Sequence, residues 1–165
     1  MRAGEDVVVL RAHSADAGAL LALQQAAYQS EARLYDDWTL PPLTQTLAEI
    51  EAAFATTLFL KAVGNNRIVG SVRAALASGT CHIGRLIVHP DHQGRGIGTQ
   101  LMACIEQAFP EAERFELFTG DKSMDNIRLY RRLGYRQYRV QDLSAKVRLV
   151  FMEKLRLDPY PLTLQ

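Results

Sequence analysis

One stretch largely determines the architecture expected of this chain: Leu86-Ile87-Val88-His89-Pro90-Asp91-His92-Gln93-Gly94-Arg95-Gly96-Ile97-Gly98-Thr99-Gln100-Leu101-Met102. An apolar, β-branched run typical of a strand ends before Pro90, and apolar residues recur with helical period after the third glycine. Between them, the glycines let main-chain N–H groups converge without Cβ atoms in the way. A helix N-terminus carries about +0.5 of an elementary charge, so this loop is suited to an anion such as pyrophosphate.

Two familiar phosphate-binding loops do not fit this spacing. A Walker loop ends in Gly-Lys-Ser/Thr, whereas Gly98 is followed by Thr99 and Gln100. A dinucleotide fingerprint has the spacing G-x-G-x-x-G, whereas this loop reads G-x-G-x-G. The loop therefore belongs to neither class.

The rest of the chain supplies a sheet around this loop. A strand over 81–88, the loop, a helix from Ile97 to about Ala108 and a strand over 115–119 predict a right-handed parallel crossover unit. Turn residues and apolar periodicity predict the other elements. These are strands over 7–12, 58–63, 68–76, 135–140 and 147–155, helices from the Ser14/Asp16 start signal to about Tyr28, from Thr44 to about Phe54 and from Ser123 to Gly134, and an ordered loop over 30–44.

These elements predict a single α/β (α+β) domain over residues 1–165, with a core over about 7–155. Its sheet should be mixed, twisted and mostly antiparallel, with about seven strands and with helices on both faces. With 165 residues, 48% of them hydrophobic, the chain can build one sizeable core. The terminal hairpin should be exposed, which is compatible with a homodimer.

Composition argues against several classes of partner. Lys and Arg number 19 against 18 Asp and Glu, so the net charge of +1 gives no global attraction to nucleic acid or to an anionic membrane. The short apolar run near the N-terminus breaks at Arg11 and fits neither a signal peptide nor a membrane span. Cys81 and Cys104 lack metal-ligand spacing and are expected to be buried free thiols. We therefore expect a cytoplasmic protein without a metal ion.

A second motif lies downstream, Asn126-Ile127-Arg128-Leu129-Tyr130-Arg131-Arg132-Leu133-Gly134-Tyr135. Asn126 and Tyr130 are four positions apart in a predicted helix, which places them about 5 to 6 Å apart on one face. This polar pair can line one wall of a binding site.

Together the two motifs resemble the signature of the GNAT superfamily of N-acetyltransferases. The family pattern is an apolar strand ending in Val-x-Pro, followed by Gln/Arg-x-x-Gly-x-Gly/Ala, and Gln93, Gly96 and Gly98 fill the last three positions. The second motif is similar to the family's Asn-x-x-x-Tyr-x-x-x-Gly-Phe/Tyr block. The resemblance follows the element order over about 7–155 and is specific between Leu86 and Tyr135.

The resemblance implies that acetyl-CoA binds where two neighbouring parallel strands, those ending at Val88 and Thr119, splay apart. It implies that the first strand pairs with the pantetheine arm and that the loop N–H groups hold the pyrophosphate. Asn126 is implied to contact the pantetheine arm, and Tyr130 to lie beside the thioester sulfur. The cofactor-binding residues implied in this way are Leu86, Ile87, Val88, Gln93, Gly94, Arg95, Gly96, Ile97, Gly98, Thr99, Asn126 and Tyr130.

Tyr130 is accordingly the expected catalytic residue. A thiol has a pKa of about 8.5 and a tyrosine about 10, so full proton transfer to a free thiolate is uphill by about 2 kcal/mol. We expect Tyr130 to donate its proton as the tetrahedral intermediate collapses, or only to hydrogen-bond the sulfur. The amine must also lose a proton, which costs about 4 to 5 kcal/mol at pH 7. The sequence has Gly84-Arg85 where many family members carry a carboxylate, which leaves Glu116, Glu31, Asp36 or a water chain to act as the base.

The acceptor-binding residues are predicted less directly. In this family the segment after the first helix usually covers the acceptor, and here it combines acidic with aromatic side chains, which suggests a cationic amine. A protein N-terminus, a lysine, a polyamine, an antibiotic and an amino-acid-like metabolite all remain open as acceptors. The candidate acceptor-binding residues are Tyr28, Glu31, Leu34, Tyr35, Asp36 and Glu116.

Two other functions fit parts of the sequence. A sensor domain that binds CoA without transferring acetyl would explain the missing strand carboxylate, but not Tyr130. A nucleic-acid module would explain the arginines at 128, 131, 132, 136 and 139, but the balanced charge opposes it and the helix macrodipole already accounts for arginines at a helix end. We therefore expect an N-acetyltransferase that transfers acetyl from acetyl-CoA directly to a small-molecule or peptide amine in a ternary complex.

Overall fold

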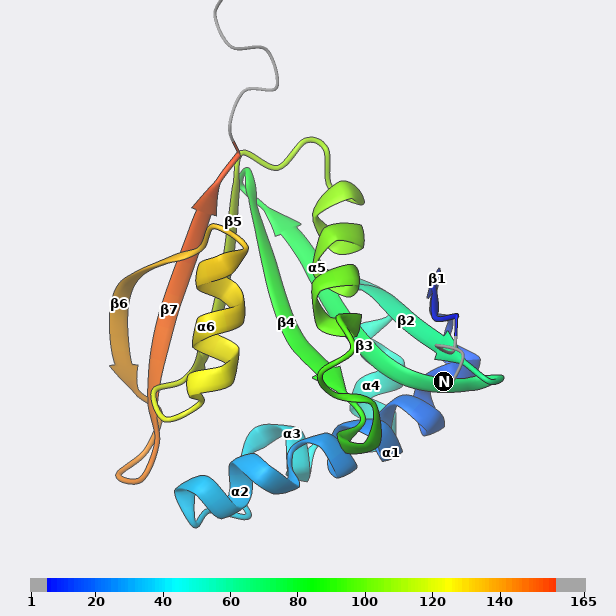
Figure 1. Ribbon diagram of the computed structural model, residues 1–165, viewed down its shortest axis with the longest axis horizontal. Helices are drawn as coiled ribbons and strands as arrows, with labels where there is room; N and C mark the ends of the chain where they lie inside the picture. Colours follow the sequence, from blue (N-terminus) through cyan, green and yellow to red (C-terminus); the bar gives the residue numbers. More distant parts are fainter. Residues whose placement is uncertain (1–5, 157–165) are drawn as a thin grey trace, which may run out of the picture.

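The computed structural model describes residues 6–156, and its centre is a seven-stranded sheet with the order β1-β2-β3-β4-β5-β7-β6 (Figure 1). All neighbouring pairs are antiparallel except β4 and β5. The predicted fold class is therefore confirmed. The strands are β1 (Val8–Arg11), β2 (Leu58–Gly64), β3 (Arg67–Ala77), β4 (Thr80–Val88), β5 (Arg114–Gly120), β6 (Arg136–Asp142) and β7 (Arg148–Leu155).

Helices cover both faces of the sheet (Figure 1). Leu101 of the fifth α-helix shares a core cluster with Val72 on one face, whereas Leu20 and Ile50 of the first and fourth pack with Phe59 on the other. No helix within residues 6–156 has the length and apolar content needed to cross a membrane. The helices are η1 (Ser14–Asp16), α1 (Ala17–Ala27), α2 (Gln29–Tyr35), α3 (Pro41–Thr44), α4 (Leu47–Ala53), η2 (Pro90–His92), α5 (Ile97–Gln107) and α6 (Met124–Arg132).

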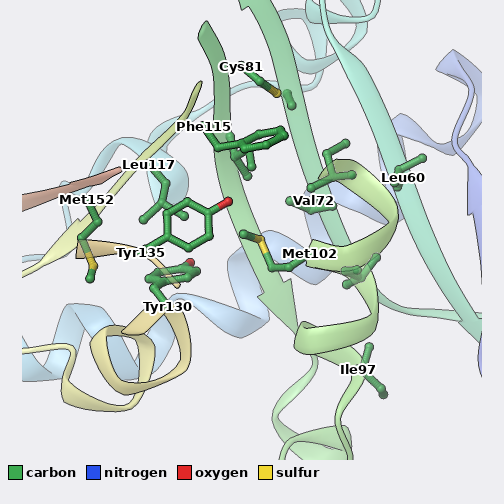
Figure 2. Close-up of a cluster of buried hydrophobic side chains, with 14 of the residues drawn as sticks. Leu60, Val72, Cys81, Ile97, Met102, Phe115, Leu117, Tyr130, Tyr135 and Met152 are labelled. Carbon is green, nitrogen blue, oxygen red and sulfur yellow. The ribbon is translucent and has the colours of Figure 1, made fainter. Parts of the chain in front are cut away.

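The larger core lies between the sheet and the helices α5 and α6. Figure 2 shows Met102 of α5 and Tyr130 of α6 among side chains of the strands, including Val72, Phe115 and Leu117. All five of these side chains are buried. Because burying apolar surface is the main favourable contribution to folding, this cluster fixes both helices against the sheet. It thereby positions the loop that precedes α5 and the helix that carries Tyr130.

The strands β4 and β5 form the parallel pair, and they pair only at one end. The paired positions run from Thr80 to His82 on β4 and from Arg114 to Glu116 on β5. Figure 1 shows the two strands meeting at this end and diverging toward α1 and α2. The predicted parallel crossover is therefore confirmed, and the divergence leaves a gap beside the second half of β4.

A β-bulge lies in β4 within the diverging half. Arg73 of β3 is opposite Gly84, and Ser71 is opposite Ile87, so β4 has one residue more than β3 between these two pairs. Arg85, inside the bulge, has a φ of 51°, in the left-handed region. A bulge bends its strand and increases its local twist, which accounts for the direction in which β4 leaves β5.

Residues 30–44, predicted to be an ordered loop, instead contain α2 and α3. Two residues of α2, Ala32 and Tyr35, are buried, and the Tyr35 Oη donates a hydrogen bond to Asp121 Oδ1 at 2.9 Å. The helix ends at Asp36, whose φ of 49° is left-handed. Tyr35 of α2 is held by Asp121, which lies 86 positions further along the chain. The short local sequence pattern therefore did not predict this helix.

The start of α4 was also predicted wrongly, because its N-cap is Thr46 rather than Thr44. The Thr46 Oγ1 accepts a hydrogen bond from the Glu49 N–H at 3.2 Å, and the Glu49 Oε1 accepts one from the Thr46 N–H at 3.2 Å. This reciprocal pair is a capping box, which satisfies two N–H groups that would otherwise be unpaired. Thr44 is instead the last residue of α3.

The two cysteines are both free thiols, but only Cys81 is fully buried. Burial raises the pKa of Cys81 to about 12, so this thiol is unreactive near neutral pH. Cys104 is only partly buried, and the prediction of two buried thiols is confirmed for Cys81 alone.

Candidate active site

Two adjoining cavities lie where β4 and β5 diverge. The first, here called the glycine-loop cavity, has a volume of about 740 Å³ and is lined by the loop before α5, by β4 and by α6. The second, here called the Tyr130 cavity, has a volume of about 500 Å³ and is lined by residues of α2, β3, β4, β5 and α6. Glu31, Leu86 and Asn126 line both cavities, so the two spaces meet at these side chains.

The glycine loop has the backbone geometry of an anion site. Gly94 and Gly96 have φ values of 75° and 80°, in the left-handed region that side chains with a Cβ rarely adopt. A Cβ at either position would meet no atom within 4 Å, so the backbone conformation rather than a lack of space requires glycine here. Gly96 is also the N-cap residue of α5, so the N–H groups of the first turn have no partner within the helix.

Most of the predicted cofactor-binding residues line the glycine-loop cavity, and they are Leu86, Val88, Gln93, Gly94, Gly96, Ile97, Gly98, Thr99 and Asn126. Ile87 and Arg95 are not among its lining residues. Ile87 is paired with Ser71 of β3, and its buried side chain lies on the α1 side of the sheet with Leu20. Arg95 is exposed to solvent. The contacts expected of these two residues involve their main-chain groups and stay predictions.

Two arginines of α6, Arg128 and Arg132, also line the glycine-loop cavity and were not predicted to do so. They are four positions apart, as Asn126 and Tyr130 are, and therefore lie on one helix face. Arg128 is 3.5 Å from Asp125, which also lines the cavity, whereas Arg132 forms no ion pair with a described carboxylate and adds a positive charge that favours an anion. The spacing could have revealed them, but the macrodipole offered a sufficient explanation for basic residues at the end of a helix.

Tyr130 lines the Tyr130 cavity from α6, with 5% of its surface exposed. Its ring contacts Tyr135 edge-on, with the ring centroids 6.0 Å apart. Burial, together with the neighbouring Tyr28 and Glu31, raises the pKa of Tyr130 well above the usual value of a phenol. The hydroxyl therefore keeps its proton at neutral pH and can act as a hydrogen-bond or proton donor. One turn earlier, Asn126 Nδ2 donates to Thr119 Oγ1 at 3.4 Å.

Two predicted acceptor residues, Tyr28 and Glu31, also line the Tyr130 cavity. Glu31 Oε2 accepts a short hydrogen bond from Ser123 Oγ, at 2.6 Å, which connects α2 to the first turn of α6. Burial raises the pKa of Tyr28, the charges of Arg85 and Arg73 lower it, and the charge of Glu31 raises it. Tyr28 therefore lies within reach of both the acidic and the basic side chains of the cavity.

Tyr35 lines the same cavity, but its hydroxyl acts within the fold. It donates to Asp121 Oδ1 at 2.9 Å and accepts from the Lys122 N–H at 2.8 Å, and burial raises its pKa to about 12. Asp36, also predicted to contact the acceptor, lines neither cavity. Its carbonyl accepts a hydrogen bond from Lys146 Nζ at 2.7 Å, so its role is to end α2 and anchor that end.

Glu116, predicted as a base or acceptor contact, lines neither cavity. Its Oε2 is 2.6 Å from Arg114 Nη1, and Arg114 also pairs with Glu153 at 2.7 Å. Burial alone would raise the pKa of Glu116, but the hydrogen bond from Arg114 holds it below its usual value. Glu116 is therefore part of an ion-pair network on the sheet, and its position outside both cavities gives no support to a role as the base.

Two basic residues of the Tyr130 cavity, Arg73 of β3 and Arg85 of the β4 bulge, were not predicted as site residues. Both are partly buried. Each stands in an apolar strand sequence, where an isolated arginine is normally a solvent-exposed residue. The bulge, which no local sequence pattern showed, is what places Arg85 in the cavity.

Residues 20–135 match a family model described as the acetyltransferase (GNAT) family, and the chain belongs to this family. The match includes both cavities' central elements, from α1 to the end of α6. The resemblance found in the two motifs is therefore confirmed.

Individual relatives are distant. The chain is 26% identical over 118 residues to "UPF0157 protein YqkA" of Bacillus subtilis (strain 168); the aligned part is 72% of this chain and only 34% of that protein. The fold is similar to that of the PaiA N-acetyltransferase from Thermoplasma acidophilum in complex with coenzyme A (TM-score 0.73, 15% identity, 92% of this chain and 99% of that one). It is also similar to that of YncA, a putative acetyltransferase from Salmonella typhimurium with its cofactor acetyl-CoA (TM-score 0.71, 22% identity, 94% and 98% covered).

Proposed function

We propose that this protein transfers the acetyl group of acetyl-CoA to a primary amine, with both substrates bound at the same time. The observation that carries the proposal is the position of Tyr130, in a cavity that adjoins the cavity of the glycine loop. A donor held by the loop can therefore reach an acceptor held in the Tyr130 cavity. Glu31 and Asn126 lie where the two spaces meet.

The glycine-loop cavity fits coenzyme A in shape and in charge. The N–H groups at the start of α5, which have no partner within the helix, suit the pyrophosphate, and Arg132 adds positive charge at the same cavity. Val88 and Leu86 lie on the part of β4 that β5 leaves unpaired, where an extended pantetheine arm can bind along the strand. Two acetyltransferase structures of the same fold contain coenzyme A or acetyl-CoA, which supports this choice of donor. When bound, acetyl-CoA supplies an acetyl group activated as a thioester.

Tyr130 is the proposed proton donor to the departing sulfur. Since a phenol is a weaker acid than a thiol and burial raises the pKa of Tyr130 further, transfer of its proton to a free thiolate is uphill. The hydroxyl therefore acts by a hydrogen bond to the sulfur, or by donating its proton while the bond to sulfur breaks. Either action stabilises charge that develops only during the reaction.

Glu31 is the proposed acceptor of the ammonium proton, directly or through a water molecule. Among the described residues that line the Tyr130 cavity it is the one carboxylate. The Ser123 hydroxyl holds it by the hydrogen bond of 2.6 Å. An amine near pKa 10.4 has to lose a proton before it attacks, which would cost about 4 to 5 kcal/mol at pH 7 without assistance. Glu31 also lines the cavity of the proposed donor, as a base at this position should.

The proposal is tested by incubating the protein with acetyl-CoA and a broad panel of amines while free thiol is measured. Thiol release that depends on one class of amine, with the acetylated amine identified by mass spectrometry, is the expected result. Saturable binding of acetyl-CoA without release for any amine would instead support a domain that senses CoA.

The edge of the sheet is compatible with the predicted homodimer. All residues of β6 are exposed, and β6 is an edge strand, so its unpaired main-chain groups can pair with a second copy. We therefore retain the homodimer as a prediction, and light scattering coupled to gel filtration measures it. A cytoplasmic location likewise stays a prediction.

A further inference from the structure

The Tyr130 cavity contains more positive than negative charge. Arg73 and Arg85 both line it, whereas Glu31 is the one acidic residue among its lining residues within 6–156. Neither arginine forms an ion pair with a carboxylate of the described chain, although Arg114, Arg136 and Arg148 each do. Partly buried arginines normally have an acidic partner, because desolvating an unpaired charge is costly.

The contacts of the two arginines within the fold leave their charge uncompensated. Arg85 Nη1 donates to the neutral amide oxygen of Gln45 at 3.0 Å, and the Arg73 guanidinium lies 5.7 Å from the centre of the Phe59 ring. Burial and the nearby Arg85 lower the pKa of Arg73 to about 10, and burial lowers the pKa of Arg85. Because guanidinium groups stay protonated in proteins, two positive charges face this cavity at neutral pH. Two like charges kept together in a cavity are typical of a site for a ligand of opposite charge.

The charges are separated along the cavity. Glu31 lies where the two cavities meet, whereas Arg73 and Arg85 line the Tyr130 cavity but not the glycine-loop cavity. The acidic end of the Tyr130 cavity therefore adjoins the glycine-loop cavity, and the two arginines line the part that does not. A ligand that spans the cavity with an amine at the acidic end would place its other polar group near Arg73 and Arg85.

We propose that the acetyl acceptor is a primary amine that also carries an oxyanion, a carboxylate or a phosphate, bound by Arg73 and Arg85. The guanidinium group matches the planar, two-oxygen geometry of these anions. This inference rests on the proposed acetyl transfer and names the acceptor class for it. It also replaces the expectation of a cationic amine, because Asp36 and Glu116 lie outside the cavity and a polyamine would meet two positive charges instead.

Matched pairs of acceptors test the inference. Each of a set of L-amino acids is compared with its own α-amide, which lacks the carboxylate. Phosphoethanolamine is compared with ethanolamine, and putrescine is included as a polyamine. The anionic member of at least one pair should have a kcat/KM at least about tenfold above its neutral partner and above putrescine. The amino acids and phosphoethanolamine distinguish a carboxylate from a phosphate.

Substitutions then connect the preference to the arginines. Arg85→Gln and Arg73→Gln should each raise the KM for the anionic acceptor at least about 30-fold, while the Kd of acetyl-CoA changes less than about twofold. Arg85→Lys, which keeps the charge but loses the planar fork, should restore part of the affinity. Arg67→Gln, at an exposed arginine of the same strand as Arg73, is the matched control and should change neither constant.

The outcomes separate this inference from the proposed function. Efficient transfer to neutral amines or to putrescine, unaffected by Arg85→Gln, would overturn the inference and leave acetyl transfer standing. Without turnover, thermal stabilisation of the CoA-bound protein by amino carboxylates or N-acetyl amino acids is measured. If these compounds raise the melting temperature of the wild type but not of Arg85→Gln or Arg73→Gln, the anion site is supported, although the proposed function has failed. No turnover and no stabilisation would overturn both.

Discussion

The two cavities are built in different ways. The glycine-loop cavity, like the other one, is lined by several segments, but its candidate anion site lies in one short loop, where left-handed glycines allow main-chain N–H groups to converge. The Tyr130 cavity is formed by side chains from α2, β3, β4, β5 and α6, which the fold brings together from distant parts of the sequence. A site made of main-chain groups keeps its binding groups when nearby side chains change. A site made of side chains changes its ligand preference with each substitution. In the proposed function the first cavity binds the common donor and the second binds a particular acceptor.

The largest effect is expected from the backbone of the loop. Gly96→Val forces a β-branched residue into a φ of 80°, so either the loop changes conformation or strain of about 2 kcal/mol remains. The affinity for acetyl-CoA should fall at least about 30-fold, which corresponds to about 2 kcal/mol. Isothermal titration calorimetry with acetyl-CoA measures it. The matched control is Gly18→Ala in α1, where no atom lies within 4 Å and the φ is not left-handed.

Glu31 lines both cavities and Glu116 lines neither, so substitutions at these two carboxylates should have different effects on the reaction. Glu31→Gln removes the proposed proton acceptor and should lower kcat/KM for the amine at least about tenfold, with most of the loss at neutral pH. Glu116→Gln changes a carboxylate outside both cavities and should leave kcat/KM within about twofold. Steady-state kinetics with the best acceptor decide between them. Equal losses from the two variants would remove Glu31 from the mechanism.

The pH dependence of the Glu116 variant provides a second readout. The folded-state pKa of Glu116 is below its unfolded value, so its stabilisation is present above the unfolded pKa and disappears as the pH falls through the folded one. Urea unfolding should therefore show wild type more stable than Glu116→Gln at pH 7, with the difference shrinking below about pH 4. A difference that grows on acidification would contradict the ion pair with Arg114.

A smaller, structural effect is expected at Tyr35. Tyr35→Phe removes the hydrogen bonds with Asp121 and the Lys122 N–H and should lower the free energy of unfolding by about 1 to 3 kcal/mol. Because its folded pKa is raised from 10 to about 12, the stabilisation should be constant from pH 6 to 9 and should be lost progressively between about pH 10 and 12. Urea unfolding at pH 6 and 9 measures it, and a loss confined to one pH would argue against a neutral phenol.

The sequence predicted the features that depend on a local pattern better than those that depend on contacts between distant residues. The loop, the β4–β5 crossover and the Asn126–Tyr130 pair each depend on a local pattern, and the sequence predicted them. The helix α2 depends on the contact of Tyr35 with Asp121, and the cavity position of Arg85 depends on a bulge, so neither has a local signal. Two missed features did have a signal: the four-residue spacing of Arg128 and Arg132, and the capping box of α4. Glu49 follows Thr46 by three positions, which is the capping-box spacing, and would have selected Thr46 over Thr44.

The central claim, that the backbone cavity binds the donor while the Tyr130 cavity carries out the reaction, is tested most directly by Tyr130→Phe. The variant keeps the ring in the buried cluster and removes only the hydroxyl. We predict that kcat with the best acceptor falls at least about tenfold, while the Kd of acetyl-CoA stays within about twofold of wild type. An unchanged kcat would contradict the claim. So would a loss of acetyl-CoA affinity large enough to explain the entire loss of activity.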